Sequence, residues 1–325
     1  RPPPMQAEAR FPAMGTDVHV VVVGGSLDHL DTARELVDDL ERRWSRFRPD
    51  SEISRLNEAG GRPVRVSAET LAMVRLALEG ARITDGRFDP TVLGAVLRAG
   101  YDRSFERLTD TSRNGHSNLD FGFARIVVDE AASTVTLPSG VGFDPGGIGK
   151  GYAADLLVRE LLSRGAAGVC ANVGGDLRVE GQAPESGPWA VAVQHPFRGR
   201  PAGMIGLRSG AVATSSRVRR AWGPKDDRRH HLIDPATGLP ARTGLAAATV
   251  IAAEGWQAEV VAKAAFVAGL SEGLFLLAST GTDGVLVDDR GALYPSLGFD
   301  RFTGSGPGPS PAPRRALTTA GGGAR

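Results

Sequence analysis

Residues 144–155 read Asp144-Pro-Gly-Gly-Ile-Gly-Lys-Gly-Tyr-Ala-Ala-Asp155, a glycine loop between a short apolar stretch and a predicted helix. Glycines at the start of a helix let backbone N–H groups approach a phosphate, and Lys150 adds a positive charge. The loop is not a nucleotide P-loop, because Asp144 stands at that motif's first glycine and Gly151 at its magnesium-binding hydroxyl. The segment therefore indicates either a phosphate site of another kind or a tight turn before an ordinary helix.

The elements predicted around this loop follow one another in irregular order. Helices are expected where apolar residues recur at helical spacing, and strands where short apolar runs lie between turns. The irregular order favours an α+β fold, with mixed or antiparallel sheets packed against helices, over a doubly wound parallel sheet. The predicted helices cover residues 26–47, 69–84, 89–98, 152–164, 256–269 and 271–279, and the strands cover 17–23, 125–129, 134–137, 141–143, 168–173, 189–194, 204–208, 246–252, 284–288 and 292–295.

Composition limits both the class of protein and its ordered part. The 325 residues carry a formal net charge of +1, which excludes a broad polybasic surface for nucleic acid, and one cysteine, which excludes a disulfide framework. No apolar run approaches the ~18 residues of a transmembrane helix. We expect a disordered N-terminal segment over residues 1–10, one folded domain over 11–300, a disordered Gly/Pro-rich tail over 301–325, and an exposed loop at 109–117.

Two further segments carry groups suited to phosphate chemistry. Asn172-Val-Gly-Gly-Asp176 places two glycines after a strand, where they form a plain turn or let a ligand lie close to the backbone. Residues 213–220 combine hydroxyls, Thr214 among them, with arginines at 217, 219 and 220. That combination suits a pyrophosphate, and its alternative is a solvated loop.

A histidine pair follows in His230-His231-Leu-Ile-Asp234. His231 can carry a proton near neutral pH, and Asp234 could orient it. Adjacent side chains diverge, so joint metal binding by the pair is the weaker alternative. His195 lies in a proline-flanked loop and is expected at the surface.

The predicted helix at 256–269 carries two charges on one face, because Glu259 and Lys263 lie four residues apart. An ion pair on the surface is the simpler alternative. However, the rest of this helix is apolar nearly all round, a pattern typical of a buried helix, and buried charges need partners. The pattern therefore favours a lined pocket at this helix.

In this order and spacing, these segments resemble the FAD:protein FMN transferases, the ApbE family. The resemblance runs from Met14-Gly15-Thr16 to about Phe299 and includes residues 51–57 (Ser-Glu-Ile-Ser-Arg-Leu-Asn) and 88–91 (Phe-Asp-Pro-Thr). It implies an α+β fold with a T-fold-like core and a deep flavin cleft. It also implies an enzyme that binds FAD and Mg²⁺, breaks the pyrophosphate, and attaches FMN to a Thr or Ser hydroxyl of an acceptor protein, releasing AMP.

The same resemblance implies roles for single residues. His231 would assist catalysis. Asp234 is expected to share that role from the residues themselves, not from the resemblance. The main-chain carbonyl of Gly147 and the carboxylate of Glu259 would fall at metal ligands. The FAD site would be lined by Met14, Phe88, Asp89, Asp144, Lys150, Leu232 and Ile233, to which Thr214 is added from the hydroxyl-rich segment.

The sequence departs from the family where metal binds. The usual helix reads Asp-Ala-x-x-Thr, whereas here the carboxylate is Glu259 and Lys263 stands in place of the hydroxyl. An ammonium has no acceptor and cannot ligate a cation.

Three outcomes follow from this departure. In the first, Lys263 replaces the metal and joins the catalytic residues by setting its charge against the FAD phosphates. In the second, metal binding is lost and the protein only binds flavin. In the third, Mg²⁺ stays on Glu259, Gly147 and phosphate oxygens while Lys263 turns aside. We favour the first, because the histidine, the glycine loop and the Asp-Pro-x-Thr-Gly turn of residues 234–238 are retained.

Two rival functions stay open besides the transferase: an FAD-binding protein with lost or reduced activity, and an FAD pyrophosphatase that gives FMN and AMP. The expected partners are FAD and an acceptor flavoprotein with a Thr/Ser motif, with no nucleic acid and no transmembrane segment. Family analogy implies the cell envelope, on the outer side of the cytoplasmic membrane. No signal or anchor is visible in the sequence, which leaves a cytoplasmic location open.

Overall fold

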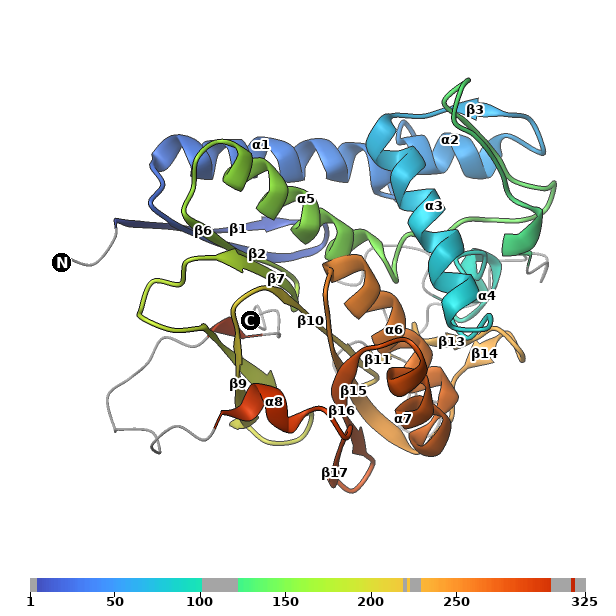
Figure 1. Ribbon diagram of the computed structural model, residues 1–325. Helices are drawn as coiled ribbons and strands as arrows, with labels where there is room; N and C mark the ends of the chain where they lie inside the picture. Colours follow the sequence, from blue (N-terminus) through green and yellow to red (C-terminus); the bar gives the residue numbers. More distant parts are fainter. Residues whose placement is uncertain (1–4, 101–121, 219–220, 223–228, 305–316, 319–325) are drawn as a thin grey trace.

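The computed structural model describes residues 5–100, 122–218, 221–222, 229–304 and 317–318. Within them, one eight-stranded sheet runs in the order β1-β2-β6-β7-β10-β15-β16-β17, and all its neighbouring strands are antiparallel. Helices cover one face of this sheet, while strands β8 and β9 lie with helix α8 at its other face (Figure 1). The fold is α+β, as the irregular order of elements predicted.

The helices in the described residues are α1 (Leu27–Trp44), α2 (Glu52–Glu58), α3 (Ala68–Ile83), α4 (Leu93–Arg98), α5 (Gly149–Ser163), α6 (Gly255–Ala268), α7 (Leu270–Ser279) and α8 (Asp300–Thr303), with a 3-10 turn at Phe123–Arg125. The main sheet is built of β1 (Gln6–Ala13), β2 (Thr16–Val23), β6 (Gly168–Val173), β7 (Asp176–Gly181), β10 (Gly210–Ser216), β15 (Leu245–Ala252), β16 (Asp283–Asp288) and β17 (Leu293–Pro295). Smaller sheets are formed by β8 (Trp189–Gln194), β9 (Pro201–Leu207) and β18 (Leu317–Thr318), by β3 (Val64–Arg65), β4 (Val127–Asp129) and β5 (Thr134–Thr136), by β11 (Ala221–Trp222) and β12 (Arg229–His230), and by β13 (Ile233–Asp234) and β14 (Leu239–Pro240).

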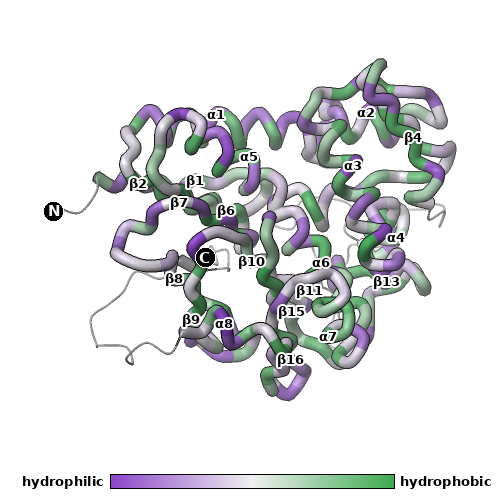
Figure 2. The backbone as a smooth tube through the Cα atoms, in the orientation of Figure 1, coloured by the Kyte–Doolittle hydropathy of each residue, from purple (hydrophilic) through white to green (hydrophobic). Residues whose placement is uncertain are grey.

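Among the helices in the described residues, α6 has the largest buried share. It packs against α3, α5 and α7 and against strands β10 and β15, and every residue from Ala258 to Phe266 is buried. Helix α1, by contrast, buries one stripe only. Figure 2 shows this difference as hydrophilic positions recurring along α1 and a largely hydrophobic α6. Any charge on α6 therefore lies inside the protein.

Helices α5 and α6 touch through their backbones near their N-termini. A Cβ built on Gly151 would lie 2.2 Å from the Gly255 carbonyl oxygen, and a Cβ on Gly255 would lie 2.3 Å from the Gly151 oxygen. Asp155 fixes the same junction, because its carboxylate accepts from the N–H groups of Gly255 (2.7 Å) and Trp256 (3.0 Å). Burial raises the pKa of Asp155 to about 6. The contact holds the glycine loop beside the first turns of α6.

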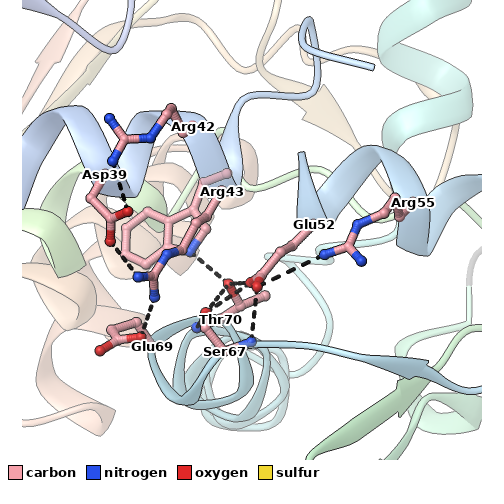
Figure 3. Close-up of polar contacts among 9 residues, drawn as sticks. Asp39, Arg42, Arg43, Glu52, Arg55, Ser67, Glu69 and Thr70 are labelled. Carbon is pink, nitrogen blue, oxygen red and sulfur yellow. Dashed lines mark hydrogen bonds and ion pairs between the residues drawn. The ribbon is translucent and has the colours of Figure 1, made fainter. Parts of the chain in front are cut away.

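Glu52, in the segment 51–57, ties α2 to the start of α3 (Figure 3). Its carboxylate accepts from the Ser67 N–H at 3.0 Å and the Ser67 hydroxyl at 2.8 Å, and the Thr70 hydroxyl donates to it as well. Thr70 also accepts from the indole N–H of Trp44, on α1, at 3.0 Å. One hydrogen-bond network thus joins α1, α2 and α3.

The ordered part extends beyond the expected range of 11–300 at both ends. Strand β1 begins at Gln6, so the expectation of disorder over residues 1–10 is wrong for residues 6–10. This strand has a weak sequence signal, because small alanines alternate toward the core, and it is held by pairing with β2. At the other end α8 runs to Thr303, and β18 pairs in parallel with β8. The rest of the tail and the loop predicted at 109–117 lie outside the described residues.

Several internal features differ from expectation. The helix predicted from Asp89 begins at Leu93, since the Asp89 carboxylate accepts from the Thr91 N–H at 2.7 Å and shapes a turn before it. Helix α5 begins inside the glycine loop. Residues 141–143 form one isolated bridge instead of a strand. His195 is buried, not superficial, and its ring bonds the Gly291 carbonyl at 3.1 Å.

We predict that Gly151→Ala destabilises the protein by at least about 2 kcal/mol, because the new methyl would overlap the α6 backbone. Gly149→Ala, two positions earlier, is the matched control, since its Cβ would find its nearest neighbour at 3.7 Å. We expect this control to stay within ~1 kcal/mol of the parent protein. Urea unfolding measures the free energy of unfolding of both variants. An equal loss of stability in the two would contradict the close contact at Gly151.

Candidate active site

Lys150 lies between two carboxylates at the start of α5. Its Nζ is 3.1 Å from Glu259 Oε1, and it also pairs with Asp176 at the start of β7. The other oxygen of Glu259 accepts from the Gly151 N–H at 2.8 Å. Both carboxylates are almost fully buried, so their charges depend on these partners. Residues from α5, α6 and β7 are thereby brought to one point.

Lys263 is the second cation at this point. It lies on α6 and is only 6% exposed. A Cβ built on Gly147 would lie 3.0 Å from its Nζ, so the amine is in contact with the glycine loop. Burial lowers the pKa of Lys263, and the negative charges of Asp144, Glu259 and Asp89 oppose that shift. We call Lys150, Lys263, Asp144, Asp176 and Glu259 the ion cluster.

Two residues that sequence reasoning missed position Asp144. The first is Arg46, whose Nε lies 3.7 Å from Asp144 Oδ1, with both side chains buried. The second is Asn57, whose amide donates to the Phe143 carbonyl at 3.0 Å and accepts from the Phe143 N–H at 2.7 Å. Asn57 belongs to the quoted segment 51–57, but nothing in that segment shows that its partner is the residue before Asp144.

Phe88 and Asp89 border the ion cluster from the loop after α3. The ring of Phe88 is buried, with its centroid 5.9 Å from Lys263 Nζ. Burial raises the pKa of Asp89, although its carboxylate accepts from the Thr91 hydroxyl at 2.6 Å. The Pro90 carbonyl accepts from the Asp144 N–H at 2.8 Å, which binds this loop to the glycine loop.

The histidine pair consists of one packed residue and one half-buried residue. His230 Nε2 lies 3.1 Å from the Ala241 carbonyl and must carry the proton, since a carbonyl only accepts. Its ring meets Phe266 edge-on with the centroids 5.9 Å apart. Burial lowers the pKa of His230 to about 4, so this histidine is neutral near pH 7. His231, at the next position and half-buried, is therefore the candidate for proton transfer.

Asp234 is engaged in its own turn. Its Oδ1 accepts from the Ala236 N–H at 2.9 Å, and its Oδ2 accepts from the Thr237 hydroxyl at 3.3 Å. The backbone carbonyl of the same residue accepts from the Gly238 N–H at 2.8 Å. These bonds shape the Asp-Pro-Ala-Thr-Gly turn. That Asp234 also orients His231 stays a prediction.

Three predicted FAD-site residues are held in place by contacts within the fold. Met14 has a positive φ of 53° in the β1–β2 turn, and its N–H donates to Glu41 at 2.9 Å. Leu232 and Ile233 are each 1% exposed. Leu232 belongs to the main core, and Ile233 packs against α4, beside which β13 lies in Figure 1. The segment that carries the histidine pair is thus packed against α4, the helix that follows Phe88 and Asp89.

Thr214 is not brought to the ion cluster. It shares its strand face with Val212, which packs on the side of the sheet away from the helices. Its hydroxyl bonds that of Thr249 on the neighbouring strand at 2.9 Å. Arg217 bonds the Leu245 carbonyl at 3.1 Å at the strand end, and residues 219–220 lie outside the described residues. In the described part of this segment, Thr214 and Arg217 therefore bond the neighbouring strand, and a pyrophosphate site made of its hydroxyls and arginines stays a prediction.

The donor atoms near Gly147 and Glu259 fit magnesium poorly. Mg²⁺ requires about six oxygen ligands in near-octahedral order. Glu259 already accepts from Lys150 and Gly151, and the Lys263 amine lies against Gly147. Across the described residues no group of three or more His, Cys, Asp or Glu side chains is arranged to hold a metal ion.

The fold and the ion cluster define an α+β protein whose charged site lies at a glycine loop. The sequence model of the ApbE family matches residues 14–286, and the chain belongs to that family. The resemblance seen in the sequence is thereby confirmed.

The chain is similar to known proteins over most of its length. It is 30% identical over 266 residues to the FAD:protein FMN transferase of Treponema pallidum (strain Nichols), covering 76% of this chain and 73% of that protein. It is 28% identical over 280 residues to the FAD:protein FMN transferase of Haemophilus influenzae, with 81% and 78% covered. The crystal structure of the ApbE protein of Thermotoga maritima superposes with a TM-score of 0.83 at 29% identity, covering 93% of this chain and 100% of that one.

We predict that Asn57→Ala lowers the free energy of unfolding by about 1–3 kcal/mol, because it leaves both backbone groups of Phe143 without their side-chain partner. Glu58→Ala, at the exposed neighbouring position, is the control and is expected to stay within ~0.5 kcal/mol. Denaturant titration of both variants measures the difference. An Asn57 variant as stable as its control would show that this clamp does not hold the glycine loop.

Proposed function

We propose that this protein is an FAD:protein FMN transferase, which moves FMN from FAD to a Thr or Ser hydroxyl of an acceptor protein and releases AMP. One observation carries the proposal beyond family membership: the glycine loop at the start of α5 meets two lysines at a buried ion cluster. Backbone N–H groups at a helix start, together with nearby cations, are suited to a pyrophosphate.

The reaction is a phosphoryl-group transfer between two oxygens. The acceptor hydroxyl oxygen attacks the FMN-side phosphorus of FAD and forms a new P–O bond. The P–O bond to the AMP portion breaks, and AMP leaves with the bridging oxygen. His231 takes the hydroxyl proton, and Asp234 assists it. Positive charge from Lys150 and Lys263 offsets the negative charge that builds on the phosphates.

Binding of the flavin dinucleotide is assigned to the loops around the ion cluster. Phe88 and Asp89 lie near Lys263, and Asp144 and Lys150 belong to the glycine loop that Lys263 contacts. Met14, Leu232 and Ile233 support these loops from the core and the β1–β2 turn. Thr214 is left out of this assignment because its side chain lies on the other face of the sheet.

The partner implied by this activity is an acceptor flavoprotein with a Thr/Ser flavinylation motif. We place the reaction at the cell envelope, on the outer side of the cytoplasmic membrane, by analogy with the family. Among the described residues, no helix combines the length and the apolar character needed to cross a membrane.

We expect that incubating the full chain with FAD and a candidate acceptor peptide containing threonine releases AMP and adds the mass of FMN to the peptide. AMP release is followed by chromatography and the peptide by mass spectrometry. Tight FAD binding with neither product would instead indicate a flavin-binding protein. AMP release without peptide modification would indicate an FAD pyrophosphatase.

We predict that His231→Ala lowers the rate of FMN transfer by at least about 100-fold, because the general base is removed. FAD binding should be unchanged, since the flavin and the phosphates are held by other residues. His29→Ala, on α1 far along the sequence from the site, is the matched histidine control. Turnover equal to that of the control would exclude His231 from the proton transfer.

A further inference from the structure

We propose that the Lys263 side chain is a built-in cation that takes the place of a divalent metal ion in this protein, so that the site works without bound metal. Three observations support the proposal: the space that Lys263 fills, the charges around it, and the partners that Glu259 already has. The consequence for FAD rests on the proposed function, whereas the statement about metal does not.

The first observation is steric. A Cβ built on Gly147 would lie 2.8 Å from Lys263 Cδ and 3.0 Å from its Nζ, and 2.9 Å from the ring of Phe88. The end of the lysine side chain and the ring of Phe88 therefore both pack directly on the backbone of Gly147. A hydrated or partly hydrated Mg²⁺ next to Gly147 would need the space that these atoms occupy.

The second observation is electrostatic. Lys263 is 6% exposed, and the carboxylates that act on its charge are Asp144, Glu259 and Asp89. A buried charge of one sign needs opposite charges close by. Acidic groups of this kind would attract a metal ion, but here an amine is already placed among them. Lys150 already lies near Lys263 and opposes its charge. A metal ion would be a further cation beside these two amines and would meet their repulsion at short range.

The third observation concerns the donor atoms. Glu259 Oε1 lies 3.1 Å from Lys150 Nζ, and Glu259 Oε2 accepts from the Gly151 N–H at 2.8 Å. Magnesium tolerates little departure from octahedral geometry, so it binds poorly to a carboxylate whose two oxygens are committed elsewhere. Lys263 itself offers three donors and no acceptor. The oxygen ligand that a hydroxyl would supply at position 263 is therefore absent.

The chemical consequence is a fixed positive charge at the loop that would hold the FAD phosphates. An amine on a buried helix is present in every molecule, whereas a metal site is occupied only according to the metal concentration. Binding of FAD should therefore not depend on divalent cations. Removing the amine should create that dependence.

The decisive measurement is Mn²⁺ binding to the full chain without FAD. The electron paramagnetic resonance signal of the free ion reports how much Mn²⁺ stays unbound. We expect the parent protein to leave Mn²⁺ free. Lys263→Thr, which opens the space and offers a hydroxyl oxygen, should bind Mn²⁺ at least ~10-fold more tightly than the parent. Lys263→Met is the matched control, because it keeps the bulk without the charge and should bind no Mn²⁺. Adding Glu259→Gln to Lys263→Thr should abolish the gain.

Two results would overturn the proposal. One is a parent protein that binds one Mn²⁺ per chain and loses it in Glu259→Gln. The other is a folded Lys263→Thr variant, judged by circular dichroism, that gains no Mn²⁺ affinity. If Lys263→Thr does not fold, measurements on the parent protein still decide. Stoichiometric Mn²⁺ binding that Glu259→Gln removes contradicts the proposal, and no such binding at millimolar metal supports it.

FAD titration tests the consequence separately. The Kd of the parent protein for FAD, from flavin fluorescence, should be the same in EDTA and in Mg²⁺. Lys263→Thr should bind FAD at least ~10-fold more weakly in EDTA and recover affinity in Mg²⁺. A parent protein that binds FAD only with Mg²⁺ refutes the built-in cation. A parent protein that binds no FAD in either condition refutes the proposed function, and the Mn²⁺ result still stands by itself.

Discussion

The backbone contact between α5 and α6 at Gly151 and Gly255 is the constraint on which the site depends. Neither position has room for a Cβ, so the two helices approach more closely than side chains would permit. This closeness lets Glu259 reach the Gly151 N–H and Lys150 from the neighbouring helix. One turn further along α6, it also sets Lys263 against Gly147.

The ion cluster shows how the protein tolerates several charges in its interior. Each buried carboxylate has a cation or a backbone N–H as partner, and the burial of α6 on all sides keeps these partners in place before any ligand arrives. Such preorganisation is what electrostatic catalysis of phosphoryl transfer requires. Because carboxylates outnumber amines in the cluster, an anionic phosphate also needs the N–H groups of the glycine loop.

Much of the fold and part of the site could be predicted from local patterns. The apolar character of residues 256–269 indicated a buried helix, and the glycine loop marked the start of another. The strands β1, β7 and β10 were missed, because small or mixed residues give no clear alternation and only pairing across the sheet defines them. Thr214 looked suitable beside arginines, yet strand alternation turns it to the opposite face.

By itself, the sequence determined the class of fold, the family and the types of groups in the site, since these depend on residue order and on local spacing. The tertiary structure decided which groups meet. Asn57 clamps Phe143 across 86 positions, and Glu259 reaches Lys150 across 109. Contacts between residues so far apart follow from how closely the helices and strands pack, and the packing depends on the whole chain at once.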